Sequence, residues 1–152
     1  MFRGVNAIIM DAKGRMALPS KYREPVQNLS EGRLVATIDP EERCLLLYPL
    51  TIWEDIEKKL QDLPSFDSKA RRVQRLLIGH ATDIELDGNG RMLIPGPLRH
   101  YATLEKHTVL IGQGKKFEVW DEQSWEAKRE EWLAESLTDD EQMPDVLGSI
   151  SL

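Results

Sequence analysis

Several short stretches of this chain either alternate hydrophobic and polar residues, the pattern of a β-strand with one buried face, or are almost continuously apolar, the pattern of a buried strand. These stretches are residues 5–10, 15–18, 34–38, 44–48, 84–86, 92–94, 109–111 and 117–120. An Asp-x-x-Gly sequence joins the first two, and another joins 84–86 to 92–94. Aspartate can bond the backbone two residues on, and glycine supplies positive φ. We therefore expect two β-hairpins, with tight turns at 11–14 and 87–90.

Helical patterns lie between the strands. Thr51, with Glu54 three positions later, forms a capping box and predicts the start of one helix. Asp67 predicts the cap of a second helix over 68–78, which Gly79 closes. One side of that second helix is basic, with Lys69, Arg71, Arg72 and Arg75.

Two other segments have weaker patterns. A short helix is expected over 20–29, but Pro25 leaves its extent open. A helix from Gln123 turns four apolar residues towards a core, namely Trp125, Trp132, Leu133 and Leu137. Beyond Thr138 the chain is acidic and is expected to be disordered.

The most informative feature is a duplication. Residues 11–15 (Asp-Ala-Lys-Gly-Arg) recur 76 positions later at 87–91 (Asp-Gly-Asn-Gly-Arg). Three single residues match at the same spacing: Met16 with Met92, Pro19 with Pro95, and Arg23 with Arg99. Downstream, Tyr48 and Trp53 match Trp120 and Trp125 at a spacing of 72, so the second unit has lost four residues, which we expect in a loop. Because each unit is too short to bury much surface alone, we expect the two halves to share one core or to swap elements.

Composition fits a soluble protein of the reducing cytoplasm. No apolar run reaches the length of a membrane span, and the single cysteine, Cys44, excludes an internal disulfide and suits a buried filler role. The net charge is −6, but residues 121–152 hold ten acidic and two basic residues. Residues 1–23 hold five basic residues and one acidic residue. A local basic face is therefore compatible with the acidic whole.

The repeated Asp-x-x-x-Arg has a structural interpretation and a functional one. Asp11 and Gly14, like Asp87 and Gly90, are the residues that a turn requires. A turn does not require the arginines that follow, and guanidinium suits phosphate and guanine edges. Arg15 is the first candidate for contact with DNA, and two nearby cations, Lys13 and Arg3, support it. The second copy has Gly88 and Asn89 in place of Ala12 and Lys13, so Arg91 is the weaker candidate; it either contacts DNA or serves the shared core or a subunit interface.

Other chemistry is less well supported. Asp11 and Asp87 could form a carboxylate dyad across a pseudo-twofold axis, but the residues that follow them do not match those of aspartic proteases, and an arginine lies four residues on. We expect no enzyme activity, no cofactor, no metal and no small-molecule substrate. The histidines His80, His100 and His107 lack metal-ligand spacing and are expected at the surface. The basic residues of 71–75 could bind phosphate or could form a solvated or subunit-facing helix side.

Several of these motifs together resemble the MraZ family. The matching segments are Met-Phe-Arg-Gly at 1–4, the two Asp-x-x-x-Arg turns, Leu-Leu-Leu-Tyr-Pro at 45–49 and the run 71–81. The resemblance implies a mostly β fold with flanking helices, in which two tandem SpoVT-AbrB repeats form one pseudo-symmetric swapped-hairpin β-barrel. The expected divisions are a first repeat at 5–52, linker helices at 53–80, a second repeat at 81–124, and a C-terminal helix with an acidic tail at 125–152.

The resemblance also implies a function. MraZ proteins are bacterial transcriptional regulators, and the family's DNA-contacting motif falls on residues 11–15 and 87–91. We expect a cytoplasmic, nucleoid-associated homo-oligomer, a ring, that binds promoter direct repeats in double-stranded DNA upstream of the division and cell-wall gene cluster, including its own gene, and that acts as a repressor. The alternative is an oligomeric protein-binding scaffold or antitoxin-like partner binder.

Overall fold

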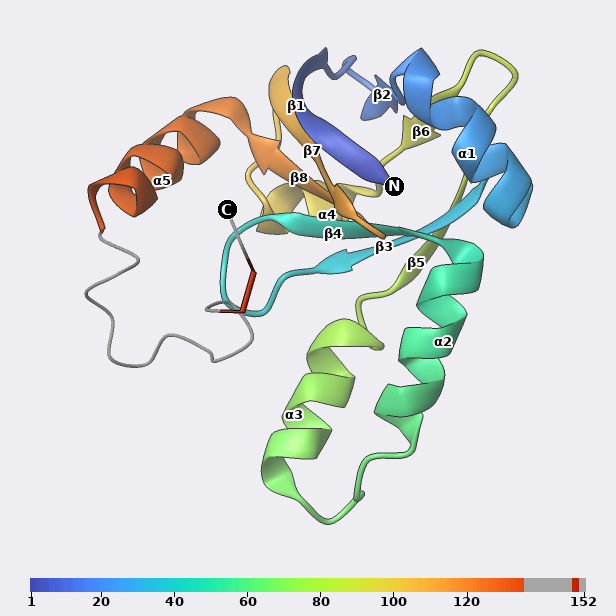
Figure 1. Cartoon of the computed structure of the whole chain (residues 1–152), viewed down its shortest axis with the longest axis vertical. Helices are drawn as coiled ribbons and strands as arrows, with labels where there is room; N and C mark the ends of the chain where they lie inside the picture. The colour runs from blue at the N-terminus through green and yellow to red at the C-terminus, as the bar shows by residue number, and fades with distance from the viewer. Residues whose placement is uncertain (136–148, 151–152) are drawn as a thin grey trace. The chain divides into compact units, whose positions relative to one another are not determined.

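The computed structural model describes residues 1–135 and 149–150 (Figure 1). In chain order the elements are β1 (Phe2–Ile9), β2 (Arg15–Ala17), α1 (Ser20–Ser30), β3 (Arg33–Ile38), β4 (Leu45–Pro49), α2 (Leu50–Gln61), α3 (Ser68–Leu77), β5 (Thr82–Glu85), β6 (Arg91–Leu93), α4 (Gly96–Tyr101), β7 (His107–Gly114), β8 (Phe117–Asp121) and α5 (Glu122–Ala134). The predicted disorder beyond Thr138, and the predicted burial of Leu137, fall outside the described residues.

The strands form two antiparallel sheets that mix the two repeats. A six-stranded sheet has the order β1-β7-β8-β4-β3-β5, and β2 pairs with β6 in a two-stranded sheet. The predicted class, mostly β with helices in two repeats, is confirmed. Among the described residues β1 and β5 remain the two edges of the larger sheet, so no ladder closes it into a barrel.

The pairing expected from the turns alone is wrong, whereas the exchange of strands that the family resemblance implies is present. The turn at 11–14 does connect two strands, but β1 pairs along its whole length with β7, and β2 pairs with β6 of the other repeat. At the centre of the β2–β6 ladder Met16 lies opposite Met92, and both side chains are almost fully buried. Each short strand therefore obtains its apolar partner from the other repeat, because a three-residue strand cannot bury its methionine alone.

The larger of two apolar clusters in the described residues serves both halves, as expected from their length. It includes Met16 and Leu18 from the first repeat and Met92 and Ile94 from the second. The ring of Phe2, on the first strand, packs against Phe117 of the penultimate element with centroids 4.3 Å apart. The first and the last strand of residues 1–122 thus pack together within one compact unit.

The four missing residues of the second repeat come from two places. Ile8 of β1 pairs with Thr108 of β7, and its counterpart Ile84 of β5 pairs with Leu34 of β3. Thr108 therefore corresponds to Leu34, so β3 and β7 match at a spacing of 74 rather than 76. Two residues are therefore lost in the segment formed by the helix and its connection to the next strand, which is 96–106 in the second repeat and 20–32 in the first. The other two are lost in the connection between β7 and β8, which is shorter than the connection between β3 and β4.

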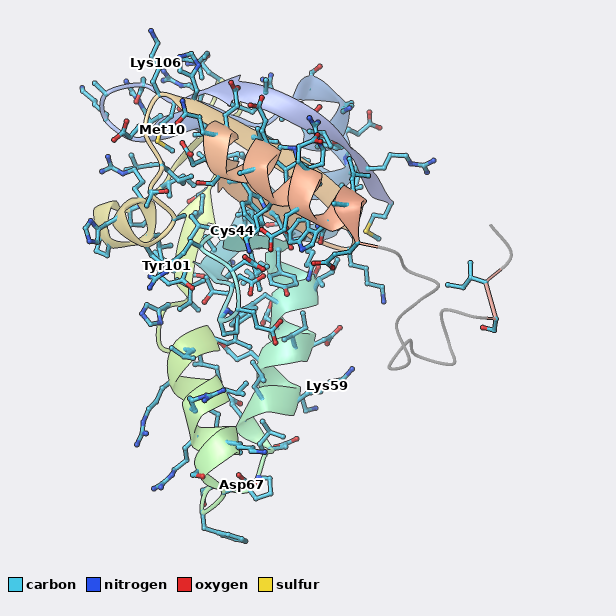
Figure 2. The ribbon with its side chains drawn as sticks, turned by 90° about the vertical axis from the view of Figure 1, so that its left-hand side faces the viewer. Met10, Cys44, Lys59, Asp67, Tyr101 and Lys106 are labelled. Atoms are coloured by element: carbon cyan, nitrogen blue, oxygen red, sulfur yellow. The ribbon has the colours of Figure 1, made fainter. Side chains whose placement is uncertain are left out.

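Helices α2 and α3 lie side by side and project from the sheet, with Asp67 at their far end (Figures 1 and 2). Asp67 caps α3 as predicted, because its carboxylate accepts hydrogen bonds from Lys69 N and Ala70 N. The capping box at Thr51 is wrong. Helix α2 starts at Leu50, after Pro49, with no side-chain cap, and the Thr51 hydroxyl donates instead to the carbonyl of Leu29.

The remaining helices differ from expectation in detail. Helix α1 continues through Pro25 to Ser30, whereas α4, the shorter counterpart of α1, was not predicted. Residues 123–152 form a second compact unit, of which 123–135 and 149–150 are described. Within it the rings of Trp125 and Trp132 pack edge to face, but Trp132 and Leu133, both predicted to face a core, are exposed. None of the described helices is long and apolar enough to cross a membrane.

Candidate nucleic-acid interface

The first turn is organised by one carboxylate. Asp11 Oδ1 accepts hydrogen bonds from Lys13 N at 3.0 Å and from Arg15 N at 2.9 Å. Its Oδ2 accepts a hydrogen bond from Arg15 Nε at 2.7 Å. One aspartate therefore closes the turn and also fixes the direction of the arginine that follows, which is why this residue pair recurs at a spacing of four.

The second turn repeats this geometry. Asp87 Oδ1 accepts from Asn89 N and Arg91 N, both at 2.9 Å, and Oδ2 accepts from Arg91 Nε at 3.0 Å. The backbone bonds to the arginines are the largest cause that holds the pKa of Asp11 and of Asp87 below the usual value of 3.8. Both carboxylates are thus ionised and engaged within their own turns, an arrangement unlike a dyad that shares a proton.

The two arginines lie on one face of the β2–β6 ribbon. In that ladder Arg15 is opposite Leu93 and Arg91 is opposite Ala17. Side chains alternate along a strand, so these four residues share the face away from the buried methionines. Arg15 and Arg91 are diagonal neighbours across the ribbon, at roughly 7–8 Å between backbones. Sequence separates them by 76 positions, but the swap brings them together.

Their guanidinium groups remain available on the solvent side. About a third of each arginine side chain is exposed, 33% for Arg15 and 36% for Arg91. In residues 1–135 the hydrogen bonds of both guanidinium groups use Nε, and no bond to Nη is found. Each arginine is thus held at Nε, while its terminal nitrogens make no hydrogen bond within these residues.

Two further arginines belong to this site, although no role follows from their sequence. Gly14 has φ of +90°, and a Cβ on it would lie 2.7 Å from Nε of Arg99, which comes from the other repeat. Gly90, with φ of +72°, is covered in the same way by Arg23. The only sequence signal for this pair is its recurrence at the spacing of the turns. Glycine is required in each turn by its backbone conformation and by the arginine packed upon it.

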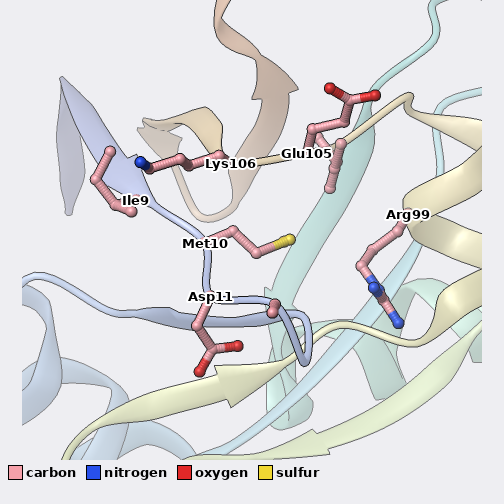
Figure 3. Close-up of a pocket in the computed structure, with 8 residues that line it drawn as sticks. Ile9, Met10, Asp11, Arg99, Glu105 and Lys106 are labelled. Atoms are coloured by element: carbon pink, nitrogen blue, oxygen red, sulfur yellow. The ribbon is translucent and has the colours of Figure 1, made fainter.

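A pocket lies beside each turn. The first, of about 450 Å³, is lined by Asp11, Arg99, Glu105 and Lys106 among others, and Arg99 reaches from α4 towards the first turn (Figure 3). The second, of about 410 Å³, lies beside the second turn, and its ionisable residues are Arg23, Glu24, Glu31 and Asp87. Two cations balance two carboxylates in the first pocket, whereas one cation faces three carboxylates in the second. The surroundings of the first turn therefore repel phosphate less than those of the second turn do.

The other predicted residues are placed as follows. Lys13 is exposed in the first turn, beside Arg15. Arg3 is exposed but lies near the start of β1, so the length of that strand, roughly 20 Å, separates it from the turn in one protomer. The three histidines are exposed, as predicted: His80, His100 and His107. Arg71, Arg72 and Arg75 are also exposed, on α3, away from the ribbon.

One group in the described residues could present donors to a metal. The thiol of Cys44 and the carboxylates of Asp39 and Glu118 have ligand atoms within 4.8 Å of one another. Burial, and then the charges of Glu118 and Asp39, raise the pKa of the thiol, so it stays protonated rather than becoming the thiolate that metals bind. Cys44 is fully buried filler, as predicted, and we assign no metal to this group.

Comparison with known proteins agrees with the duplicated geometry. A family model described as "MraZ protein, putative antitoxin-like" matches the chain twice, at residues 1–76 and 77–145. The chain belongs to the MraZ family. It is 57% identical to the transcriptional regulator MraZ of Coxiella burnetii, 56% to that of Legionella pneumophila and 54% to that of Halorhodospira halophila. Each of these matches covers all 152 residues of this chain and all of the relative.

The two matches to the MraZ family correspond to the two structural repeats. The first contains the turn at 11–14 and the second contains the turn at 87–90. Each MraZ match thus supplies one strand and one arginine of the β2–β6 ribbon. The ribbon face is complete only when both halves of the chain are folded together.

Proposed function

We propose that the protein is a transcriptional regulator that binds double-stranded DNA through the exposed face of the β2–β6 ribbon. The observation that carries this proposal is the placement of Arg15 and Arg91 on that face, each fixed at Nε by an aspartate. A two-stranded antiparallel ribbon fits the major groove of B-DNA. Terminal arginine nitrogens without a hydrogen-bond partner in residues 1–135 can donate to the O6 and N7 acceptors of guanine or to phosphate oxygens.

The two arginines contribute unequally in this proposal. Lys13 adds a cation beside Arg15, and Asn89 has none beside Arg91. Glu24 and Glu31, near the second turn, repel phosphate. Arg15 therefore makes the closest approach to DNA, with Lys13 as a supporting charge and Arg91 reading from the diagonal position. Arg3 supports binding from the start of β1.

A second copy of the chain is the proposed partner of β1. Val5 and Ile9 of this edge strand are 58% and 57% exposed. On β5, Asp83 and Glu85 occupy the positions that correspond to Ala7 and Ile9, and such charges protect an edge strand from pairing. The first repeat lacks this protection, and an exposed apolar strip on an edge strand is typical of an interface.

The target and the assembly rest on the family. Relatives named transcriptional regulator MraZ support a regulatory role. We assign to this chain the expected target, promoter direct repeats upstream of the division and cell-wall gene cluster that includes its own gene, with repression by an oligomeric ring at the nucleoid. Several ribbons on one ring multiply weak contacts through effective concentration. The divisions at 5–52, 53–80, 81–124 and 125–152 stay part of this proposal.

Replacement of Arg15 by alanine tests the site. A promoter fragment with direct repeats, titrated by fluorescence anisotropy, should bind Arg15→Ala roughly 5–150-fold more weakly, the loss expected for one bidentate base contact. The mass from light scattering should not change. Lys59→Ala, which removes a cation from α2 away from the ribbon, is the matched control (Figure 2). Equal losses of DNA affinity in the two variants would mean that only the overall charge of the protein matters, and would contradict the assignment of the ribbon as the DNA-binding face.

The salt dependence separates DNA binding from the alternative function. If six to ten phosphates are contacted, affinity should fall roughly 10³–10⁵-fold between about 50 and 200 mM salt. A scaffold or antitoxin-like binder would show no such salt dependence, because it would not bind the DNA fragment. It would instead co-purify with a stoichiometric protein partner, and that result would replace the DNA-binding proposal.

A further inference from the structure

Arg99 takes part in a closed set of contacts with the first turn. Its Nε donates to the carbonyl of Ile94 at 2.9 Å, and Ile94 N in turn donates to the carbonyl of Gly14 at 2.9 Å. The guanidinium packs on Gly14, because a Cβ on this glycine would lie only 2.7 Å from Nε and 2.8 Å from Cζ of Arg99. A turn of the first repeat is thus held by two contacts from the second, one from Ile94 and one from Arg99.

The same set of contacts recurs with the repeats exchanged. Arg23 Nε donates to the carbonyl of Leu18 at 2.8 Å, Leu18 N donates to the carbonyl of Gly90 at 2.9 Å, and the guanidinium covers Gly90. These contacts exist only because β2 and β6 are exchanged between repeats. A duplicated chain that folded as two independent hairpins would have no reason to keep both arginines in register with both glycines.

We infer that Arg99 is the positioning residue for Arg15, and that Arg23 is the positioning residue for Arg91, so that each repeat sets the reading arginine of the other. The role in DNA recognition rests on the proposed contact of Arg15 and Arg91 with DNA. The fixing of each turn by the other repeat does not depend on that contact. Asp11 aims Arg15 only if the backbone of the turn is in place, because the same carboxylate binds both. Bidentate recognition tolerates displacements of about 0.5 Å.

The chemistry explains why arginine occupies both positions. A planar guanidinium can donate along one edge to a carbonyl while its flat face covers a glycine. An ammonium group on a lysine stem can replace the hydrogen bond but not the flat contact. Arg99→Lys therefore keeps the charge and removes the fixing of the turn. It also provides a second variant if Arg99→Met folds poorly.

Hydrogen exchange of the whole chain without DNA tests the fixing of the turns directly. In Arg99→Met the amides of 13–15 should exchange roughly fivefold faster or more, because the guanidinium no longer packs on Gly14, while those of 89–91 keep their rate. Arg23→Met should show the reverse. Arg99→Lys should resemble Arg99→Met. Acceleration of both turns alike, or of the turn in the same repeat, would overturn the inference.

Double-mutant cycles on repeat-containing DNA test the functional consequence. In the Arg99→Met background, Arg15→Ala should weaken binding less than about threefold, because the contact is already misplaced. In the Arg23→Met background it should keep its full effect, and Arg91→Ala should couple to Arg23→Met instead. Lys106→Met, which removes a cation from the pocket beside the first turn, should be additive with Arg15→Ala.

Additive losses for Arg15 and Arg99 would overturn the inference. If the wild-type chain binds no DNA, the proposed function is refuted. The hydrogen-exchange rates would then decide by themselves whether each turn is fixed by the arginine of the other repeat.

Discussion

At the residue scale, one aspartate in each turn acts on both the backbone and a side chain. Asp11 receives two backbone N–H groups and the Arg15 guanidinium, and Asp87 receives the same set from its own turn. Hydrogen bonds of this kind favour the ionised carboxylate. Because this geometry depends on the negative charge, it is sensitive to acid.

We predict that Asp11→Asn lowers stability most at neutral pH. The pKa of Asp11 is lowered in the folded protein, chiefly by the backbone bond to Arg15. The stabilisation is therefore complete above the ordinary value of 3.8 and disappears as the pH falls through the lower folded value. Urea unfolding of both proteins from about pH 7 to about pH 2 should show two curves that converge in acid. A constant difference would mean that the charge of Asp11 plays no part.

The residue types of each turn are readable from sequence because the physics is local. An Asp-x-x-Gly segment specifies its own turn, and the arginine follows at a fixed distance along the same strand. The covering residues Arg23 and Arg99 are different. Arg23 lies 67 residues before Gly90 and Arg99 lies 85 residues after Gly14, so no local pattern can pair them.

At the element scale, the two α-helices of the projecting pair begin in different ways. Helix α3 has a true side-chain cap from Asp67, whereas α2 follows Pro49 and is fixed by the packing of Trp53 on Tyr48, with ring centroids 5.6 Å apart. Trp53 is 3% exposed, so burial rather than capping holds this helix.

Alanine substitutions should separate these two modes. Asp67→Ala should destabilise the protein by about 0.5–2 kcal/mol, the usual cost of losing an N-cap. Thr51→Ala, at the position where the sequence suggests a capping box, should cost a few tenths of a kcal/mol or roughly nothing, since its hydroxyl caps no helix. Thermal and urea unfolding of the two variants provide the comparison. A larger loss at Thr51 would show that the capping box forms after all.

At the scale of the whole molecule, the ribbon joins the two repeats into one folding unit. Met16 and Met92 face each other at its centre and are 1% and 0% exposed. Each lies in the core of the other repeat as much as in its own. The repeats of this chain should therefore unfold together.

We predict that Met92→Ala destabilises the first repeat as strongly as the second. Loss of a buried methionine should cost about 2–5 kcal/mol. Hydrogen exchange should show faster opening of β1 and β3 together with β5 and β7, within a single unfolding transition. Exchange that accelerates only in residues after 81 would contradict a shared core.

The sequence by itself determined the duplication, the location of most strands, the composition of both turns and the family. These features depend on alternation, spacing and turn chemistry, which act over a few residues. The resemblance to the family implies an exchange of hairpins, but only the tertiary structure decided which strands pair, and so placed Arg15 beside Arg91 and Arg99 over Gly14. The physical reason is that a three-residue strand is satisfied by either partner locally, and only the gain from burying both methionines in one core favours the exchange.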